Sequence, residues 1–503
     1  MSPIDLAVIA VYVTGCTALG AWLGSRSQGL RGYFLGESNI PTWAVMISIV
    51  ATETSIVTYL SVPGVAYSED FRFLQLAFGF LLGRVVVAAV LLPAYFRGEV
   101  LTAYQLLQDR FGGPTRTTAS LLFLVARSLG DGLRLFLAST VLEHLTGWRP
   151  EAAIIAVAAI TIVYTFLGGM KAVIWTDVIQ FGVYILGASV ALAILAHKIP
   201  GGWGELVHQA SAAGKFRLLD FSIDLSQPYT FWAGLIGGMV LNTATHGADQ
   251  LMVQRYLSAR SQRQAAIALV SSGFVILVQF AFFLFIGVSL WVFYREFPPT
   301  AAVGGGVRSA DQVFSYFIVH YLPRGVLGLV IAAIFSAAMG TLAGSLNSSA
   351  STIVNDLYRP LTGRTDERHL VRVSRAMTVV WGVILAAVAF GARLLKESVV
   401  ENALKIAGLV SGILLGLFLL GILTRRVGQT AAMAGVLAGA AAVLYAWART
   451  ELAFPWFALV GSSTVFIVGL AAQQGLGARD QGPGGRDTEQ SASKRTAAGP
   501  PNP

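Results

Sequence analysis

The sequence is poor in charge and in cysteine. Asp, Glu, Lys and Arg make up only 12% of its 503 residues, about half of the ~25% that is typical of soluble globular proteins. Too few charged side chains remain to cover the surface of a water-soluble fold, and a hydrophobic content of 55% excludes disorder over most of the chain. The single cysteine, Cys16, excludes a disulfide framework and a thiolate zinc cluster.

Long apolar runs dominate what is present. A bilayer core of about 30 Å requires about 20 apolar residues per helix, and about thirteen runs meet this length. They lie near residues 4–24, 41–66, 72–96, 117–146, 151–168, 172–197, 229–254, 264–294, 324–355, 371–392, 399–423, 429–448 and 454–474. The sequence therefore predicts an all-α integral membrane protein with about 13 transmembrane helices. The first run is not expected to be a cleaved signal peptide, because no basic region precedes it.

Basic residues between the runs predict the orientation of the chain. The formal net charge of +9 is concentrated in short clusters, which suit membrane loops better than a nucleic-acid surface. The richer of the two alternating sets of loops contains Arg26, Arg31, Arg97, Arg110, Arg116, Lys171, Arg255, Arg260, Arg263, Arg359, Arg364, Arg368, Arg372, Arg375, Arg425 and Arg426. Such loops face the cytoplasm. We therefore expect a multi-pass plasma-membrane protein with its N-terminus outside and its C-terminus cytoplasmic, in contact with the lipid bilayer and without nucleic acid or an obligatory protein partner.

The runs also predict an internal repeat. Runs two to six and runs seven to eleven form two groups of five, and each group begins with a polar helix interrupted by Gly or Pro. This pattern indicates an inverted repeat with a binding site at the repeat interface, near the middle of the membrane. The expected parts are a first run with a cytoplasmic loop, the first repeat, an extracellular loop, the second repeat, two final runs and a disordered cytoplasmic tail, at residues 1–40, 41–197, 198–228, 229–423, 424–474 and 475–503.

The second run contains a polar cluster around a carboxylate. Thr52, Glu53 and Thr54 lie in mid-run, and Pro63 and Gly64 follow. Proline removes a backbone donor and frees a carbonyl. Hydroxyl and carbonyl oxygens surrounded by hydrocarbon suit a small hard cation such as sodium. The alternative is a kinked helix in which Glu53 pairs with a buried arginine.

The fourth run carries three charged residues on one helical face. Arg127, Asp131 and Arg134 are spaced by four and three residues, so they can pair with one another. A self-neutralising triad is one interpretation. One positive charge is left over, however, and Arg84 and Lys405 lie in other runs. This surplus favours an anionic solute.

Three further runs place polar groups at membrane depth. In the seventh run, glycines flank Asn242, Thr245 and His246, as in a discontinuous helix around a ligand, although a single histidine is more often structural. Asp177 in the sixth run could neutralise a passing cation or bond to a neighbouring helix. The small residues of 336–349 in the ninth run fit either close helix packing or a binding site.

Three motifs resemble those of the sodium/solute symporter family, which includes the bacterial sodium/galactose and sodium/proline symporters. They are Lys171–Gln180, Asp249–Ala259 and Asn347–Tyr358, and the resemblance extends over roughly residues 5–475. It implies a LeuT-type fold of thirteen spans, with a five-plus-five inverted-repeat core at spans two to eleven.

The resemblance also implies a sodium site between the second and ninth spans. Its ligands would be two carbonyls of the second span and three groups of the ninth, at Ala51, Thr54, Ala337, Gly340 and Thr341. Relatives typically have hydroxyl residues at the last two positions, so Gly340 lacks one ligand. Glu53 stands where the sodium/proline symporters have an Asp. Ala343 and Gly344 lack the hydroxyls of a second site, which implies one sodium per cycle.

For the solute, the resemblance points to Thr58, Asn242, Thr245 and Arg134, and it places Asp177 on the sodium exit path. The expected function is sodium-coupled import of a small polar solute, a carboxylate or a sugar, by alternating access. A proton-coupled transporter that uses Glu53 is the alternative, and a solute sensor that does not transport is less favoured. The common hydrolase and metal-site motifs are missing, so no catalytic residue is expected.

Overall fold

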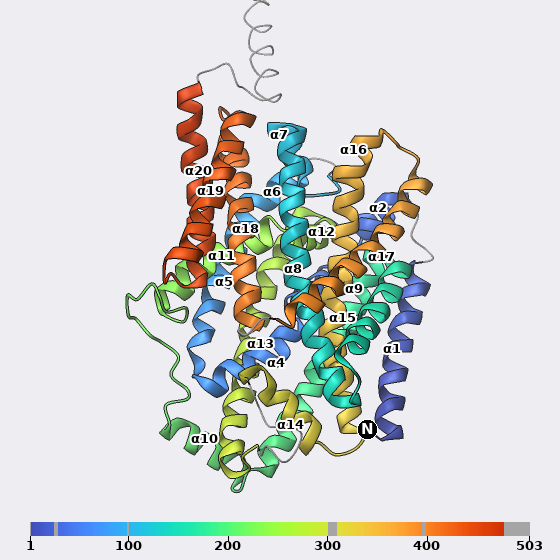
Figure 1. Cartoon of the computed structure of the whole chain (residues 1–503), viewed down its shortest axis with the longest axis vertical. Coiled ribbons are helices and arrows are strands. Elements are labelled where there is room, and N and C mark those ends of the chain that lie inside the picture. Colours follow the sequence, from blue (N-terminus) through green and yellow to red (C-terminus); the bar gives the residue numbers. More distant parts are fainter. Residues whose placement is uncertain (1, 25–28, 98–99, 300–308, 395–398, 477–503) are drawn as a thin grey trace, which may run out of the picture.

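The computed structural model describes residues 2–24, 29–97, 100–299, 309–394 and 399–476. These residues form a bundle of helices, most of which run along the long axis of the molecule (Figure 1). Within these ranges β-pairing is limited to one isolated bridge, between Ile40 and Ala259. The expected all-helical architecture is confirmed for the described chain.

The first half of the bundle contains the predicted runs one to six. Its helices are α1 (Pro3–Gly24), α2 (Gly29–Leu35), α3 (Thr42–Glu53), α4 (Ile56–Ser68), α5 (Leu74–Val86), α6 (Leu92–Phe96), α7 (Gln105–Phe111), α8 (Gly113–Thr146) and α9 (Pro150–Lys198). A π-helical turn, Val87–Leu91, joins α5 to α6. Gly169 has a φ of +64° and kinks α9, so the two expected runs on either side of it form one bent helix.

The second half contains runs seven to thirteen. Its helices are α10 (Gly202–Ala212), α11 (Gly238–Gly247), α12 (Gln250–Leu257), α13 (Gln262–Glu296), α14 (Val313–Tyr321), α15 (Val326–Thr352), α16 (Arg359–Thr362), α17 (Glu367–Ala392), α18 (Val399–Leu423), α19 (Gln429–Arg449) and α20 (Phe457–Leu476). Two π-helical segments, η4 (Ala233–Gly237) and η6 (Ile353–Tyr358), precede α11 and follow α15. The short helix α10 lies in the expected loop 198–228.

Nine helices in the described ranges are long and apolar enough to cross a membrane, or ten if α3 and α4 count as one bent span. The other expected runs fall on α8, on the shorter apolar stretch Pro150–Val163 of α9, and on the interrupted pair α11 and α12. α8 carries its charged triad in mid-helix. All thirteen runs therefore coincide with helices, although fewer meet the length and composition of a continuous span.

The break in the second run lies before the proline. α3 and α4 are bent by 60° relative to each other. Thr54 leaves helical geometry, and extended Ser55 caps α4 by accepting a hydrogen bond from Val57 N at 3.3 Å. Pro63 is accommodated inside α4. The polar cluster, rather than the Pro63–Gly64 pair, is thus the point at which this helix is interrupted.

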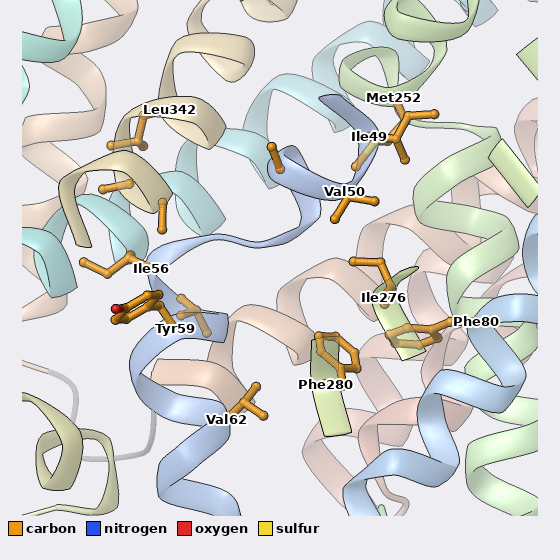
Figure 2. Packing of buried hydrophobic residues seen from close by; sticks show 14 of the residues in the cluster. Ile49, Val50, Ile56, Tyr59, Val62, Phe80, Met252, Ile276, Phe280 and Leu342 are labelled. Carbon is orange, nitrogen blue, oxygen red and sulfur yellow. The ribbon is translucent and has the colours of Figure 1, made fainter. Parts of the chain in front are cut away.

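Both halves of the broken helix belong to one apolar core. Figure 2 shows Val50 before the break and Ile56 and Tyr59 after it, and Leu342 of α15 belongs to the same cluster. α15 is buried along almost its whole length and packs mainly on α9. This packing brings the interrupted backbone of α3 against the small-residue face of α15.

Candidate functional site

The end of α3 meets α15 through a hydroxyl group. Thr341 Oγ1 donates to Thr52 O at 3.0 Å and to Ala337 O at 3.5 Å. Thr54 Oγ1 donates to Val50 O and accepts from Gln279 Nε2, so the side chain of Thr54 is engaged. The end of α3 and the Ala337–Thr341 turn of α15 are therefore buried against each other, and the contact is made by Thr52, which lies between Ala51 and Thr54 in the sequence.

The close packing around position 340 leaves no room for a side chain larger than that of glycine. A Cβ atom there would lie 2.6 Å from Gln180 Oε1 and 3.2 Å from Asp177 Oδ1. A side chain at this position would displace Gln180. Among the described residues, Asp177 Oδ1 and both amide atoms of Gln180 have no hydrogen-bond partner. Buried oxygen atoms without a donor suit a hard cation, so the donor chemistry around Gly340 fits sodium even though the hydroxyl is missing.

Asp177 lies in a fully buried ion pair. Its Oδ2 accepts from Ser48 Oγ at 2.5 Å and from Arg255 Nη2 at 3.1 Å, and Arg255 Nε donates to Ser48 Oγ at 3.0 Å. A Cβ at Gly344 would lie 2.6 Å from Arg255 Nη2, so this glycine leaves space for the guanidinium. Asp177 was expected either to neutralise a passing cation or to bond to a neighbouring helix, and the structure shows the bond to a neighbouring helix.

A cavity of about 170 Å³ lies beside the break. It is lined by all four predicted solute residues, together with Glu53 and Thr341: Thr58, Asn242, Thr245 and Arg134. The other predicted residues lie outside its lining: Ala51, Thr54, Ala337, Gly340 and Asp177. The predicted ion ligands thus lie outside the cavity that the predicted solute residues line. Thr341 is the exception, because it is a predicted ion ligand that also lines the cavity.

Glu53 forms an ion pair with an arginine. Arg84, on α5, is fully buried and donates to Glu53 Oε2, to Phe80 O at 3.1 Å and to Ser272 Oγ at 3.2 Å. His246 Nε2 lies 3.5 Å from the same carboxylate oxygen. The alternative interpretation, in which Glu53 neutralises a buried arginine, therefore describes the contacts.

The charged face of α8 opens onto the cavity. Asp131 Oδ1 lies 2.6 Å from Arg134 Nη1 and 3.5 Å from Arg127 Nη1, and Ser345 Oγ donates to Asp131 Oδ2. Arg127 Nη2 also pairs with Asp249 Oδ2 at 2.5 Å. The pairing predicted from the spacing is confirmed.

The surplus of positive charge expected in the spans is smaller at the cavity. Asp249 pairs with Arg127, which leaves Asp131 for Arg134 and Glu53 for Arg84. The motif Asp249–Ala259 drew attention to Asp249, but its partner lies 122 positions away on another helix, so no sequence signal connects the two.

Comparisons with known proteins identify the family. The family model described as "Sodium:solute symporter family" matches residues 33–439. The chain belongs to this family. The human sodium/iodide cotransporter is 31% identical over 88% of this chain and 69% of its own length. The sodium/sialic acid symporter SiaT of Proteus mirabilis is 29% identical over 93% and 94%, and the human sodium-coupled monocarboxylate transporter 1 is 30% identical over 88% and 72%.

Solved structures agree with this assignment. A sodium-coupled sialic acid symporter in a substrate-bound outward-open state matches with a TM-score of 0.86 at 28% identity, over 95% of this chain and 99% of that one. Mhp1, a nucleobase–cation symporter in a closed conformation, matches with a TM-score of 0.58 at 13% identity, over 92% of this chain and 99% of its own, and shows the fold alone. The protein is a multi-pass membrane symporter, and sodium is its coupling ion.

Proposed function

We propose that this symporter imports a small organic anion across the plasma membrane together with one sodium ion, by alternating access. The observation that carries the proposal is the pair of guanidinium groups on one wall of the cavity. Arg127 and Arg134 both line the cavity, and Asp131 and Asp249 hold their guanidinium groups there. A guanidinium offers planar donors that match a carboxylate.

The cavity lining and the relatives support an anionic solute. The cavity is enclosed on one side by the charged residues of α8, so a solute that carries an anionic group can meet them there. Iodide, monocarboxylates and sialic acid, named for the relatives, are all anionic. In this scheme Arg134 holds the anionic group, while Thr58, Asn242 and Thr245 bond to the rest of the solute.

The ion would bind where α3 ends against α15. Carbonyls of Ala51, Thr54 and Ala337 and the hydroxyl of Thr341 are the proposed ligands, and Gly340 lets Gln180 and Asp177 approach beside them. Sodium there joins the two helices and favours the state that accepts solute, and Asp177 lies on the proposed path toward the cytoplasm.

The membrane topology is part of the proposal. Thirteen spans, with runs two to eleven as two inverted repeats, fit the positions of the helices. In Figure 1 the start of α1, α10 and α14 lie at one end of the bundle, and α7 and α16 lie at the other. This arrangement fits an external N-terminus and a cytoplasmic side that contains the arginine-rich loops.

The test is a melting experiment followed by uptake. The purified protein is heated in sodium chloride or choline chloride with iodide, pyruvate, N-acetylneuraminate, galactose or proline. A ligand that binds only the folded state raises the midpoint, and coupled ligands strengthen each other's binding. We expect sodium to raise the midpoint and one anion to raise it further. A shift that follows pH instead of sodium would favour the proton-coupled alternative and Glu53, and binding without uptake into liposomes would favour a sensor.

A further inference from the structure

Arg127 takes part in two different contacts, one with the solute cavity and one with the residue before α12. It lines the solute cavity, and its Nη2 holds Asp249, the first residue before α12. α12 has only eight residues and is separated from α11 by the non-helical Ala248–Asp249 link. One guanidinium therefore connects the place where an anion would bind with the end of a short, separately hinged helix.

We infer that the anionic group of the solute displaces Asp249 from Arg127 and thereby releases α12 toward the cytoplasm. The inference rests on the proposed function, because it requires an anionic solute in this cavity. It assigns Arg127 a role in coupling solute binding to helix movement, in addition to the solute contact proposed for Arg134.

The exchange is energetically feasible because Asp249 has a second partner. Its Oδ1 accepts a hydrogen bond from Leu251 N at 2.9 Å and caps α12. A carboxylate at a helix N-terminus is stabilised by the exposed N–H groups. Asp249 therefore keeps one bond when it leaves Arg127, and the arriving carboxylate gives Arg127 an equivalent partner. The released carboxylate has no second ionic partner among the described residues, so the exchange also requires that Asp249 become hydrated, which avoids the large penalty of an unpaired buried ion.

The other contacts around the Ala248–Asp249 link indicate which helix would move when Asp249 is released. Tyr95 donates to Gly247 O and Tyr104 donates to Ala248 O at 3.2 Å, so both hold the end of α11. α12 itself is held by Gln250, which bonds to Leu101 O and Ala103 N, by Gln254, which donates to Phe34 O and Asn347 Oδ1, and by the Arg255–Asp177 pair at its other end. Releasing Asp249 removes the ion pair nearest the link, and the inferred movement of α12 about Ala248 requires that these hydrogen bonds exchange as well.

The requirement for solute follows from this arrangement. A ligand shifts a conformational equilibrium only by its difference in affinity for the two states. Asp249 competes with the solute for Arg127 while α12 is closed and does not compete once α12 is released. An anion therefore binds the released state more tightly, and linkage requires that it favour release by the same factor.

A cysteine reporter on α12 tests the inference. Val253 is fully buried on α12 and lies outside the cavity lining. With Cys16, the single native cysteine, changed to Ala, Val253→Cys becomes the sole thiol, and a membrane-impermeant maleimide is applied to the cytoplasmic face of vesicles in sodium. We expect slow labelling in chloride alone and faster labelling with whichever of iodide, pyruvate or N-acetylneuraminate is carried.

Two substitutions each remove one partner of the Arg127–Asp249 pair. Asp249→Asn retains an oxygen for the cap but loses the charge, so it should label without solute, faster than the parent protein by about 5- to 150-fold, the usual range for coupled sites. It should also bind the carried anion more tightly. Arg127→Gln should label equally fast but no longer respond to the anion. Retention of the sodium-dependent melting shift shows that both variants fold.

The matched control is Asp356→Asn. Asp356 also pairs with an arginine of α8, Arg116, at 2.7 Å, and it accepts from Thr102 and Ser120. It lies outside the cavity lining. Its loss should lower the melting temperature without speeding the labelling of Val253→Cys, which separates general destabilisation from release of α12.

Slow labelling of a folded Asp249→Asn variant would overturn the inference while leaving the proposed symport intact. Acceleration of the parent protein by an uncharged solute and by no anion would overturn it too. Failure of the parent protein to respond to sodium at all would refute the proposed function itself, and the solute-free comparison of Asp249→Asn with the parent protein would still decide whether this ion pair holds α12.

Discussion

The ion pair between Glu53 and Arg84 gives a quantitative prediction. Changing Glu53 to Gln removes the charge opposite a guanidinium that has no solvent exposure. Arg84 would retain Phe80 O and Ser272 Oγ as neutral acceptors. Removing one partner of a buried pair typically costs about 3–5 kcal/mol, which raises the unfolded fraction by roughly a hundred- to several-thousand-fold.

The second half of this prediction is the double variant. When Glu53→Gln is combined with Arg84→Met, neither charge remains, and an apolar side chain of similar length fills the space. Replacement of a buried pair by packed apolar groups is often neutral, so most of the lost stability should return. Interaction between two residues in contact appears as non-additivity of this kind.

The assay is thermal melting of the purified protein in detergent, for the parent, both single variants and the double variant. Refutation would come from a Glu53→Gln protein within about 1 kcal/mol of the parent, the value expected of an exposed pair, or from a double variant no more stable than the single ones. Uptake by the stabilised double variant then reports what the carboxylate does in transport beyond holding Arg84.

Three further predictions follow from the site and its surroundings. Thr341→Ala should raise the sodium concentration for half-maximal uptake by about tenfold or more, equivalent to at least 1.4 kcal/mol. If uptake were driven by protons, the substitution would not affect it, and a sodium titration of uptake distinguishes the two cases. With one sodium and a monoanion the cycle moves no net charge, so a 100 mV potential, worth about 2.3 kcal/mol per charge, should not change accumulation, and a current during uptake would contradict this. Lys215→Met should lower stability by about 2 kcal/mol in melting experiments, because Lys215 Nζ donates to Tyr67 O at 2.8 Å and Glu69 O at 2.6 Å, at the end of α4, and a hydrogen bond from a charged donor contributes about 1.5–3 kcal/mol.

Features that depend on neighbouring residues could be predicted from the sequence. Apolar runs of membrane length coincide with helices because hydropathy acts locally. The spacing of Arg127, Asp131 and Arg134 placed them on one face of α8, and their pairing is confirmed. The second run was expected to be interrupted, and α3 and α4 are bent by 60° relative to each other.

Features that depend on residues far apart in the sequence could not be predicted from it. Pro63 is a strong local signal for a kink, yet it is tolerated inside α4 and the helix breaks at Thr54 and Ser55. The space at Gly340 is filled by Gln180 from another helix. Asp249 balances the charge of Arg127 only because the link between α11 and α12 lies within reach of α8. Each of these outcomes is decided by packing between helices, which local sequence patterns do not encode.

The charge balance around the cavity links these contacts to coupled transport. Three arginines, Arg84, Arg127 and Arg134, are matched by Glu53, Asp131 and Asp249. With these pairs intact the site carries no net charge from its paired groups, and a sodium ion bound beside it adds one positive charge. An uncompensated charge in hydrocarbon is expensive, so under the proposed function the sodium-loaded protein favours an anion. With a monoanion bound, ion and solute would together restore neutrality, and the loaded carrier could reorient. The same accounting explains why neither ligand alone should cross readily: sodium alone leaves a positive charge in the membrane, and the anion alone leaves a negative one.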